Sequence, residues 1–141
     1  MPRKDLYHDE LVAALIADGW TITDDPYPLN VDGTVLYIDV GAERQLIGAQ
    51  RGSERIAVEV KSFAGPSTVN EFEKSLGQYL LYLIALQEHE PSRTLFLALP
   101  LAFDRVLRNH RLFSLALQRH AINTVIFDEE QQVIYRWDQR S

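Results

Sequence analysis

The sequence predicts one α/β (α+β) domain over residues 1–141, with a central mixed β-sheet flanked by helices. Three stretches, at about 5–18, 68–89 and 101–120, carry hydrophobic residues at helical spacing, whereas the runs between them alternate or are wholly apolar. Glycine and proline residues mark most of the borders. A chain of 141 residues with 46% hydrophobic content is long enough for one hydrophobic core.

The composition excludes several classes of protein. The chain has no cysteine, which excludes disulfides and thiolate zinc sites. No apolar run reaches the length of a membrane span and no signal core opens the sequence, so we expect a cytoplasmic protein. The net charge of -6 is opposite to that of a typical nucleic-acid-binding domain. The only basic concentration is formed by Arg105, Arg108, Arg111 and Arg119.

The first elements are a helix over about 5–18, stopped by Gly19, and a strand over 20–23. Two prolines in 24–28 predict that this strand ends there, because proline cannot extend a central ladder. The pair Asp32-Gly33 predicts a turn, followed by a strand that carries Asp39 and runs to about Val40.

The chain is then expected to bend or bulge at 41–43 and to remain extended over 45–50. We expect a hairpin turn at 51–54 and a strand over 55–62 that carries Glu59 and Lys61. Asp39 and Glu59 are therefore expected on strands of one meander.

A break at 63–67 precedes the long helix, which the capping box at 68–71 opens and which ends near His89. Its predicted apolar face consists of Phe72, Leu76, Tyr79, Leu80, Leu83, Ile84 and Leu86. The apolar run 94–99 predicts a strand covered on both faces and parallel to a neighbour. One helix over 101–120 and a hairpin of 122–127 and 133–137, with its turn at 128–131, complete the chain. The expected core stripe of the helix is Phe103, Val106, Leu107, Leu112, Leu115 and Ala116.

Two of the predicted strands carry ionisable groups at unusual positions. In the later strand, alternation puts Ala57, Glu59 and Lys61 on one face and Ile56, Val58 and Val60 on the other. In the earlier strand, Tyr37 and Asp39 share one face, and the opposite face carries Leu36, Ile38 and Val40. If the strands are neighbours, Asp39, Glu59 and Lys61 converge. Two carboxylates suit a hard cation such as Mg²⁺ or Mn²⁺, and an ammonium stabilises developing charge. The alternative is an ordinary solvated strand face with an ion pair.

This order of elements resembles the core of the PD-(D/E)xK nuclease superfamily, the restriction-endonuclease-like fold. The resemblance implies that Asp39 and Glu59 bind metal and that Lys61 positions the attacking water, although Ile38 stands where the family name has proline. Gln78-Tyr79-Leu80-Leu81-Tyr82 resembles the Q-h-x-x-Y helix motif of the RecB-like branch, which implies that Gln78 lies beside the site. Glu10 matches the acid that several branches carry on the first helix, or is an ordinary early-helix acid.

Four segments together resemble the XisH family, the fdxN element excision controlling factors of cyanobacteria. These segments are 20–26, 37–39, 57–63 and 77–79. The resemblance implies a role in programmed DNA-element excision during heterocyst development, together with a XisI-like partner protein.

Two functions are consistent with these observations. One is a metal-dependent endonuclease that uses Asp39, Glu59, Lys61, Gln78 and Glu10. The other is an inactive nuclease-fold protein that regulates a recombinase by binding DNA or a XisI-like partner. The acidic charge predicts that the chain alone binds DNA weakly. The sequence leaves the oligomeric state open, a homo-oligomer included.

Overall fold

The computed structural model describes residues 5–46 and 52–141. Its helices and strands, in chain order, are α1 (His8–Ala17), β1 (Thr21–Asp24), β2 (Tyr27–Val31), β3 (Thr34–Ile38), β4 (Val40–Leu46), β5 (Gly52–Val60), α2 (Thr68–His89), β6 (Arg93–Pro100), α3 (Leu101–Asn109), α4 (Arg111–Arg119), β7 (Thr124–Asp128) and β8 (Val133–Asp138).

The central sheet is mixed, as predicted. Its six strands lie in the order β1-β4-β5-β6-β7-β8, and β2 pairs with β3 in a separate hairpin. The pairs β5–β6 and β6–β7 are parallel, and the pairs on either side of them are antiparallel. Each parallel pair is joined through helical crossovers, α2 in the first case and α3 with α4 in the second.

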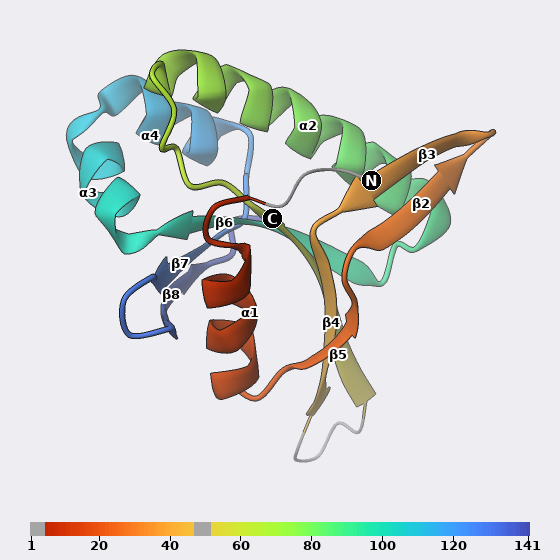
Figure 1. Cartoon of the computed structure of the whole chain (residues 1–141). Helices are drawn as coiled ribbons and strands as arrows, with labels where there is room; N and C mark the ends of the chain where they lie inside the picture. The colour runs from red at the N-terminus through yellow and green to blue at the C-terminus, as the bar shows by residue number, and fades with distance from the viewer. Residues whose placement is uncertain (1–4, 47–51) are drawn as a thin grey trace.

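Helices cover both faces of the sheet, which divides the core into two layers (Figure 1). The layer under α2, α3 and α4 contains Ala57, Leu95 and Leu97 from the sheet. The layer under α1 contains the alternate residues of the same strands, such as Val58 and Phe96. The strand β6 is buried along almost its whole length, as expected for a strand covered on both faces.

The first strand ends at Asp24, as the prolines predicted, but the sequence did not predict the strand that follows. Tyr27–Val31 forms β2 with Pro28 inside it. A two-stranded sheet has no central position, so a proline is tolerated there. The predicted Asp32-Gly33 turn is confirmed, with positive φ angles of 50° and 90°. Figure 1 shows this hairpin projecting beside the end of α2.

Residues 41–43 lie inside β4 without a bend. The register does shift opposite Gly41 and Ala42, but the extra residue is on β1, between Ile22 and Asp24. The bend is at Asp39. As a result Ile38 packs in the α2 layer and Val40 in the α1 layer, so they do not share a face as strand alternation predicted. The turn expected at 51–54 is not found in its described part. Gly52, Ser53 and Glu54 belong to β5, and Arg51 and 47–50 lie outside the described residues.

The helices differ from prediction at their ends. The N-cap of α2 is Ser67, one residue before the predicted box, and its side chain accepts a hydrogen bond from Asn70 N–H over 3.3 Å. The predicted helix 101–120 is two helices, because His110 takes an extended backbone and its ring stacks on Phe113. None of the helices in the described parts of the chain combines the length and hydropathy needed to cross a bilayer.

The buried faces of the helices are narrower than their apolar faces. Leu80 and Ile84 of α2 are exposed, although hydrophobic spacing predicts them in the core. Val106 and Leu112 of α3 and α4 are exposed for the same reason: hydrophobic spacing does not distinguish a side chain turned to the core from one turned to solvent.

Candidate active site

Asp39 and Glu59 face one another across the junction of two strands. The antiparallel register pairs Val40 with Val58 and Gly41 with Ala57, so its continuation by one residue sets Asp39 opposite Glu59. Glu59 shares its face of β5 with Ala57, which packs in the α2 layer. The bend at Asp39 therefore brings two carboxylates together on the face that α2 covers.

Backbone hydrogen bonds fix both carboxylates. Val60 N–H donates to Asp39 Oδ2 over 2.8 Å, and Asp39 N–H donates to Glu59 Oε1 over 3.2 Å. Each bond uses a backbone donor on the segment that carries the other acid. One oxygen of each carboxylate is held in this way; the others are Asp39 Oδ1 and Glu59 Oε2, and the latter lies beside the Lys61 ammonium.

Lys61 supplies a positive charge at the same point. Its ammonium nitrogen lies 3.4 Å from Glu59 Oε2, and its side chain is 27% exposed while that of Glu59 is 6% exposed. Lys61 N–H continues the parallel ladder by donating to Ala98 O over 3.0 Å. The backbone of Lys61 is thus fixed by the sheet while its ammonium group reaches the acids.

Burial makes the acid pair costly in its fully ionised form. Burial and the neighbouring Asp39 charge raise the pKa of Glu59 to about 8, although Lys61 opposes the shift. Burial also raises the pKa of Asp39, against the hydrogen bond from Val60. Because these two facing carboxylates are largely buried, binding of a cation that neutralises their charge is favoured.

Side chains of α2 close the site. A cavity of about 140 Å³ is lined by Asp5, Tyr37, Asp39, Glu59, Val60, Lys61, Gln78 and Tyr82. Gln78 and Tyr82 stand one helical turn apart, as the sequence indicated, and both reach this cavity. Gln78 Oε1 is buried and has no hydrogen-bond partner among the described residues, so this oxygen can accept a hydrogen bond from a group bound in the cavity. Burial and the negative charge of Glu59 raise the pKa of Tyr82.

Sequence reasoning missed Asp5 and Tyr37 as lining residues. Asp5 Oδ2 accepts a hydrogen bond from Ser62 N–H over 3.1 Å, which ties the chain before α1 to the segment after Lys61. That contact joins residues far apart in sequence, so no local pattern reveals it. The signal for Tyr37 is present in the sequence, because strand alternation groups it with Asp39, although the bend at Asp39 interrupts that alternation in the structure.

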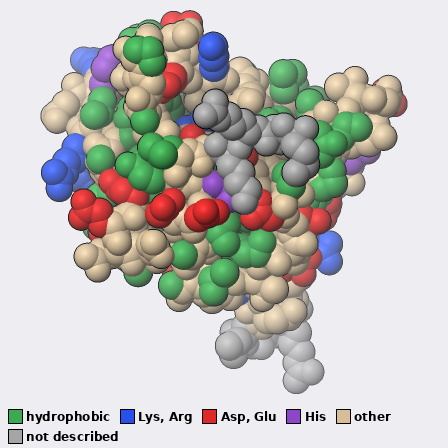
Figure 2. All heavy atoms as spheres, in the orientation of Figure 1, with side chains coloured by type: hydrophobic (Ala, Val, Ile, Leu, Met, Phe, Trp, Pro, Cys, Tyr) green, Lys and Arg blue, Asp and Glu red, His purple; other side chains and the backbone are tan. Residues whose placement is uncertain are grey.

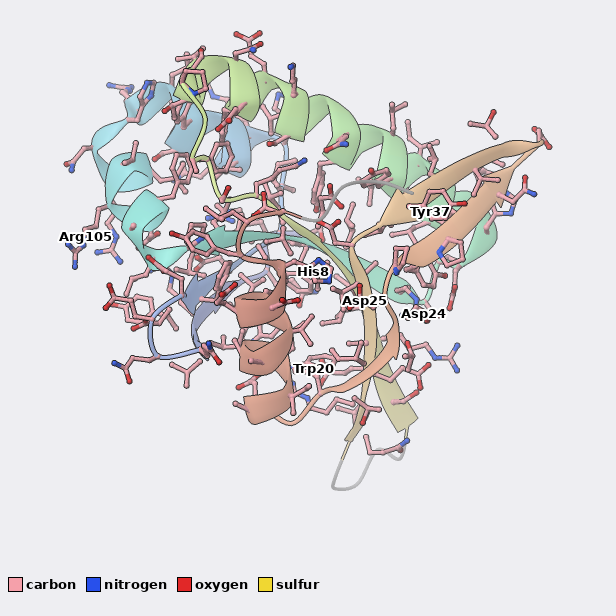
Figure 3. The ribbon with its side chains drawn as sticks, viewed as in Figure 1. His8, Trp20, Asp24, Asp25, Tyr37 and Arg105 are labelled. Atoms are coloured by element: carbon pink, nitrogen blue, oxygen red, sulfur yellow. The ribbon has the colours of Figure 1, made fainter. Side chains whose placement is uncertain are left out.

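Glu10 is not among the residues that line the cavity. It belongs to α1, and its Oε2 atom is buried without a partner in the described part of the chain. The residue of α1 that pairs with an acid is His8, which is 3% exposed and lies 2.8 Å from Asp25 Oδ1. Figure 3 shows these two side chains close to each other, between the start of α1 and the chain that leads into β2. The role of Glu10 remains a prediction.

The donor set fits Mg²⁺ or Mn²⁺ bound by two carboxylates. Within residues 5–46 and 52–141 no three His, Asp or Glu side chains are grouped for a metal. Both carboxylate oxygens of Asp5 accept backbone hydrogen bonds, so we take Asp39 and Glu59 as the donors here. Mg²⁺ commonly uses one or two carboxylates and completes its shell with water and substrate phosphate oxygens. Burial raises the pKa of both acids, and the Asp39 charge raises that of Glu59 further, so a divalent cation would relieve the cost of ionising them together.

A larger cavity, of about 530 Å³, lies elsewhere and has different chemistry. Its lining includes Trp20, Arg44 and Trp137, and among the described residues that line it Glu54 is the one acid. Arg44 stacks over the Trp20 ring at 4.4 Å, so the aromatic surface is already covered. Size alone would favour this cavity, but its described lining lacks the facing acids, so we assign the chemistry to the smaller one.

Comparisons with known proteins point to a single family. The model of the family described as XisH protein matches residues 1–135. A crystal structure of an XisH family protein from Nostoc punctiforme PCC 73102 is 36% identical, with 94% of this chain and 98% of that chain covered and a TM-score of 0.83. A crystal structure of an fdxN element excision controlling factor protein from Anabaena variabilis is also 36% identical, with 95% and 98% covered and a TM-score of 0.83. No curated protein matches the chain at a significant level.

Proposed function

This chain belongs to the XisH family, and on that premise we propose that it takes part in controlling the excision of a DNA element, through a metal-dependent endonuclease centre at Asp39, Glu59 and Lys61. One of the similar structures is named as an fdxN element excision controlling factor, which supports the process. The facing carboxylates with Lys61 beside them are the observation that supports the chemistry.

The proposed reaction is hydrolysis of a phosphodiester in DNA. A water oxygen attacks phosphorus, the bond from phosphorus to the leaving oxygen breaks, and that oxygen takes up a proton. A divalent cation held by Asp39 Oδ1 and Glu59 Oε2 would supply the acidified water and neutralise phosphate charge. Lys61 stabilises the negative charge that develops on phosphate, since its ammonium projects into the same cavity.

The helix α2 contributes positioning to this reaction. The unpartnered Gln78 Oε1 accepts a hydrogen bond from the attacking water or from the Lys61 ammonium. Tyr82, 7% exposed, forms an apolar wall that limits water access beside the acids. Both side chains come from one face of α2, so the helix acts as the cover of the site.

A plasmid-nicking assay tests this proposal. Wild-type protein with Mg²⁺ or Mn²⁺ is expected to convert supercoiled plasmid to relaxed circles, and Glu59→Gln and Lys61→Ala are expected to lose this activity. Glu130→Gln, an exposed acid in the turn before β8, is the matched control and should behave as wild type. Equal nicking by all variants would identify a contaminating nuclease, and its complete absence with the wild type would exclude the endonuclease.

The second candidate is an inactive nuclease-fold protein that regulates a recombinase by binding DNA or a XisI-like partner. Its charge favours a protein partner: the net charge is -6, and Figure 2 shows a row of acidic side chains across the middle of the visible face. Arg105, from the one basic stretch, lies in Figure 3 at the opposite end of the molecule from Tyr37, which lines the cavity. Association with a XisI-like protein without nicking would favour this candidate.

A further inference from the structure

The outer face of α2 carries an apolar stripe that is about half exposed in the described chain. Leu80, Leu81 and Ile84 are 46%, 61% and 58% exposed. They fall at helical spacing with Gly77, so the four residues, which we call the α2 stripe, form one strip along the helix. Figure 1 places α2 along the top of the molecule, and Figure 2 shows separate hydrophobic side chains exposed there. Contiguous exposed apolar side chains of this kind mark interaction surfaces.

Gly77 is the second observation. It lies in the interior of a helix of 22 residues, where glycine costs stability relative to alanine. A Cβ atom added at Gly77 would meet nothing within 4 Å, so the monomer gives no steric reason for a glycine there. A notch at this position serves the close approach of a partner's helix.

The charges at the two ends of the stripe complement one another. Lys74 precedes the stripe and Glu88 follows it, and both are exposed without an ion pair in the described residues. If two copies of α2 pack antiparallel about Leu81, residues equally far before and after it face each other. Lys74 then faces Glu88 of the second copy, and Glu73 faces His89.

The same pairing fills the notch. Gly77 faces the turn that carries Ile84 and Ala85 in the second copy, so the large Ile84 side chain enters the space that Gly77 leaves open. Leu81 meets its own counterpart at the two-fold axis. Apolar stripe, notch and end charges are therefore self-complementary, as a two-fold symmetric interface requires.

We propose that the α2 stripe is the interface of a homodimer in which two copies of α2 pack antiparallel about Leu81. The stripe borders Gln78 and Tyr82, which turn toward the cavity, so the dimer sets one cavity on each side of the helix pair. That two cavities would serve the two strands of a duplex rests on the proposed function. The dimer itself does not, since its tests measure association alone.

Sedimentation and light scattering provide the first test. The wild type should be a dimer that dissociates on dilution, and Leu81→Glu should be a monomer with an unchanged circular dichroism spectrum. Leu112→Glu is the matched control, because Leu112 is equally exposed on α4 but outside the stripe, and it should remain a dimer. A wild type that stays monomeric up to its solubility limit overturns the proposal and leaves this face to a partner of different sequence.

Charge reversal and cross-linking fix the register. Lys74→Glu and Glu88→Lys should each weaken the dimer by about tenfold or more in Kd, and the double variant should restore it. The chain has no cysteine, so Leu81→Cys introduces a lone thiol that should form a disulfide-linked dimer on oxidation. Leu112→Cys should not cross-link. Failure of the double variant to recover, or equal cross-linking of both cysteine variants, overturns the antiparallel pairing.

Discussion

The carboxylates of Asp39 and Glu59 each accept a backbone hydrogen bond from the segment that carries the other acid. Val60 N–H, next to Glu59, donates to the Asp39 carboxylate, and Asp39 N–H donates to the Glu59 carboxylate. The bend that ends the β2–β3 hairpin is therefore bonded to the end of β5 through the same groups that we assign to catalysis. Structural and chemical roles overlap in these two side chains, so tests of the site must separate loss of function from loss of fold.

The first prediction concerns pH. The pKa of the Glu59 carboxyl is raised to about 8 in the folded chain, so between pH 4.5 and 8 the folded state keeps a proton that the unfolded chain has lost. The free energy of unfolding is then highest at the acidic end of this window and falls as the pH rises through it. The fall is roughly 1.4 kcal/mol for each unit by which the folded pKa exceeds the unfolded pKa. Urea unfolding at several pH values should show this fall. Glu59→Gln should flatten it and Glu130→Gln should not.

The second prediction concerns the metal. A cation that binds only the folded acid pair stabilises the fold by mass action, by about 2.7 kcal/mol at a hundred times its Kd. Mg²⁺ or Mn²⁺ should raise the melting temperature more at pH 8 than at pH 5, because protons compete for the same oxygens. Thermal shift assays would show this difference. An equal response of wild type and Asp39→Ala would mean that the metal binds elsewhere.

The third prediction separates the roles of two cavity residues in plasmid nicking. Lys61→Ala should lower the rate by about 100-fold to 1,000-fold, as loss of one group that stabilises transition-state charge does elsewhere. Gln78→Ala should cost about tenfold, since an orienting group can be replaced in part by water. Gln87→Ala, an exposed glutamine on the same helix, is the control. A Gln87→Ala effect as large as that of Gln78→Ala would remove Gln78 from the site.

The fourth prediction concerns partners. The isolated chain should bind duplex DNA weakly at physiological salt, because neutralised phosphates supply much of such affinity and this chain has 20 acids against 14 bases. A XisI-like protein should form a specific complex with it. An electrophoretic shift assay measures the DNA binding, and a pull-down measures the association with a XisI-like protein. Tight, sequence-specific DNA binding by the chain alone, with no XisI-like association, would contradict the prediction.

The fifth prediction concerns how α2 is anchored. Tyr79 Oη donates to Leu95 O over 3.3 Å and accepts from Asn123 N–H over 3.1 Å. Tyr79→Phe leaves that buried N–H unsatisfied and should lower the free energy of unfolding by about 1–2 kcal/mol. Tyr135→Phe, at an exposed tyrosine, should change it little. Urea denaturation of the two variants makes the comparison.

Much of the fold could be predicted from local pattern. The mixed sheet, the buried strand β6 and the long helix α2 follow from hydrophobic period and length. The break at His110 and the bend at Asp39 do not, because each depends on tertiary packing that no periodic signal encodes. The displaced bend also explains why Ile38 and Val40 separate into different layers.

The site is also partly predictable from local pattern. Glu59 and Lys61 share a face by strand alternation, and Gln78 with Tyr82 by helical spacing, so the sequence alone groups these side chains. Asp5 reaches the cavity through a hydrogen bond between residues 57 positions apart, which sequence spacing cannot reveal. Only the family resemblance favours Glu10, and it is the one predicted site residue that does not line the cavity.

The register of β4 against β5 has a consequence for the endonuclease that we propose. A slip of one residue in this pairing would turn Glu59 to the α1 layer and leave Asp39 facing an apolar side chain. Chains in which this pairing is absent or slipped would therefore lack the facing acids. In the proposed endonuclease, the ladder would confine cleavage to molecules that have folded with the correct strand register.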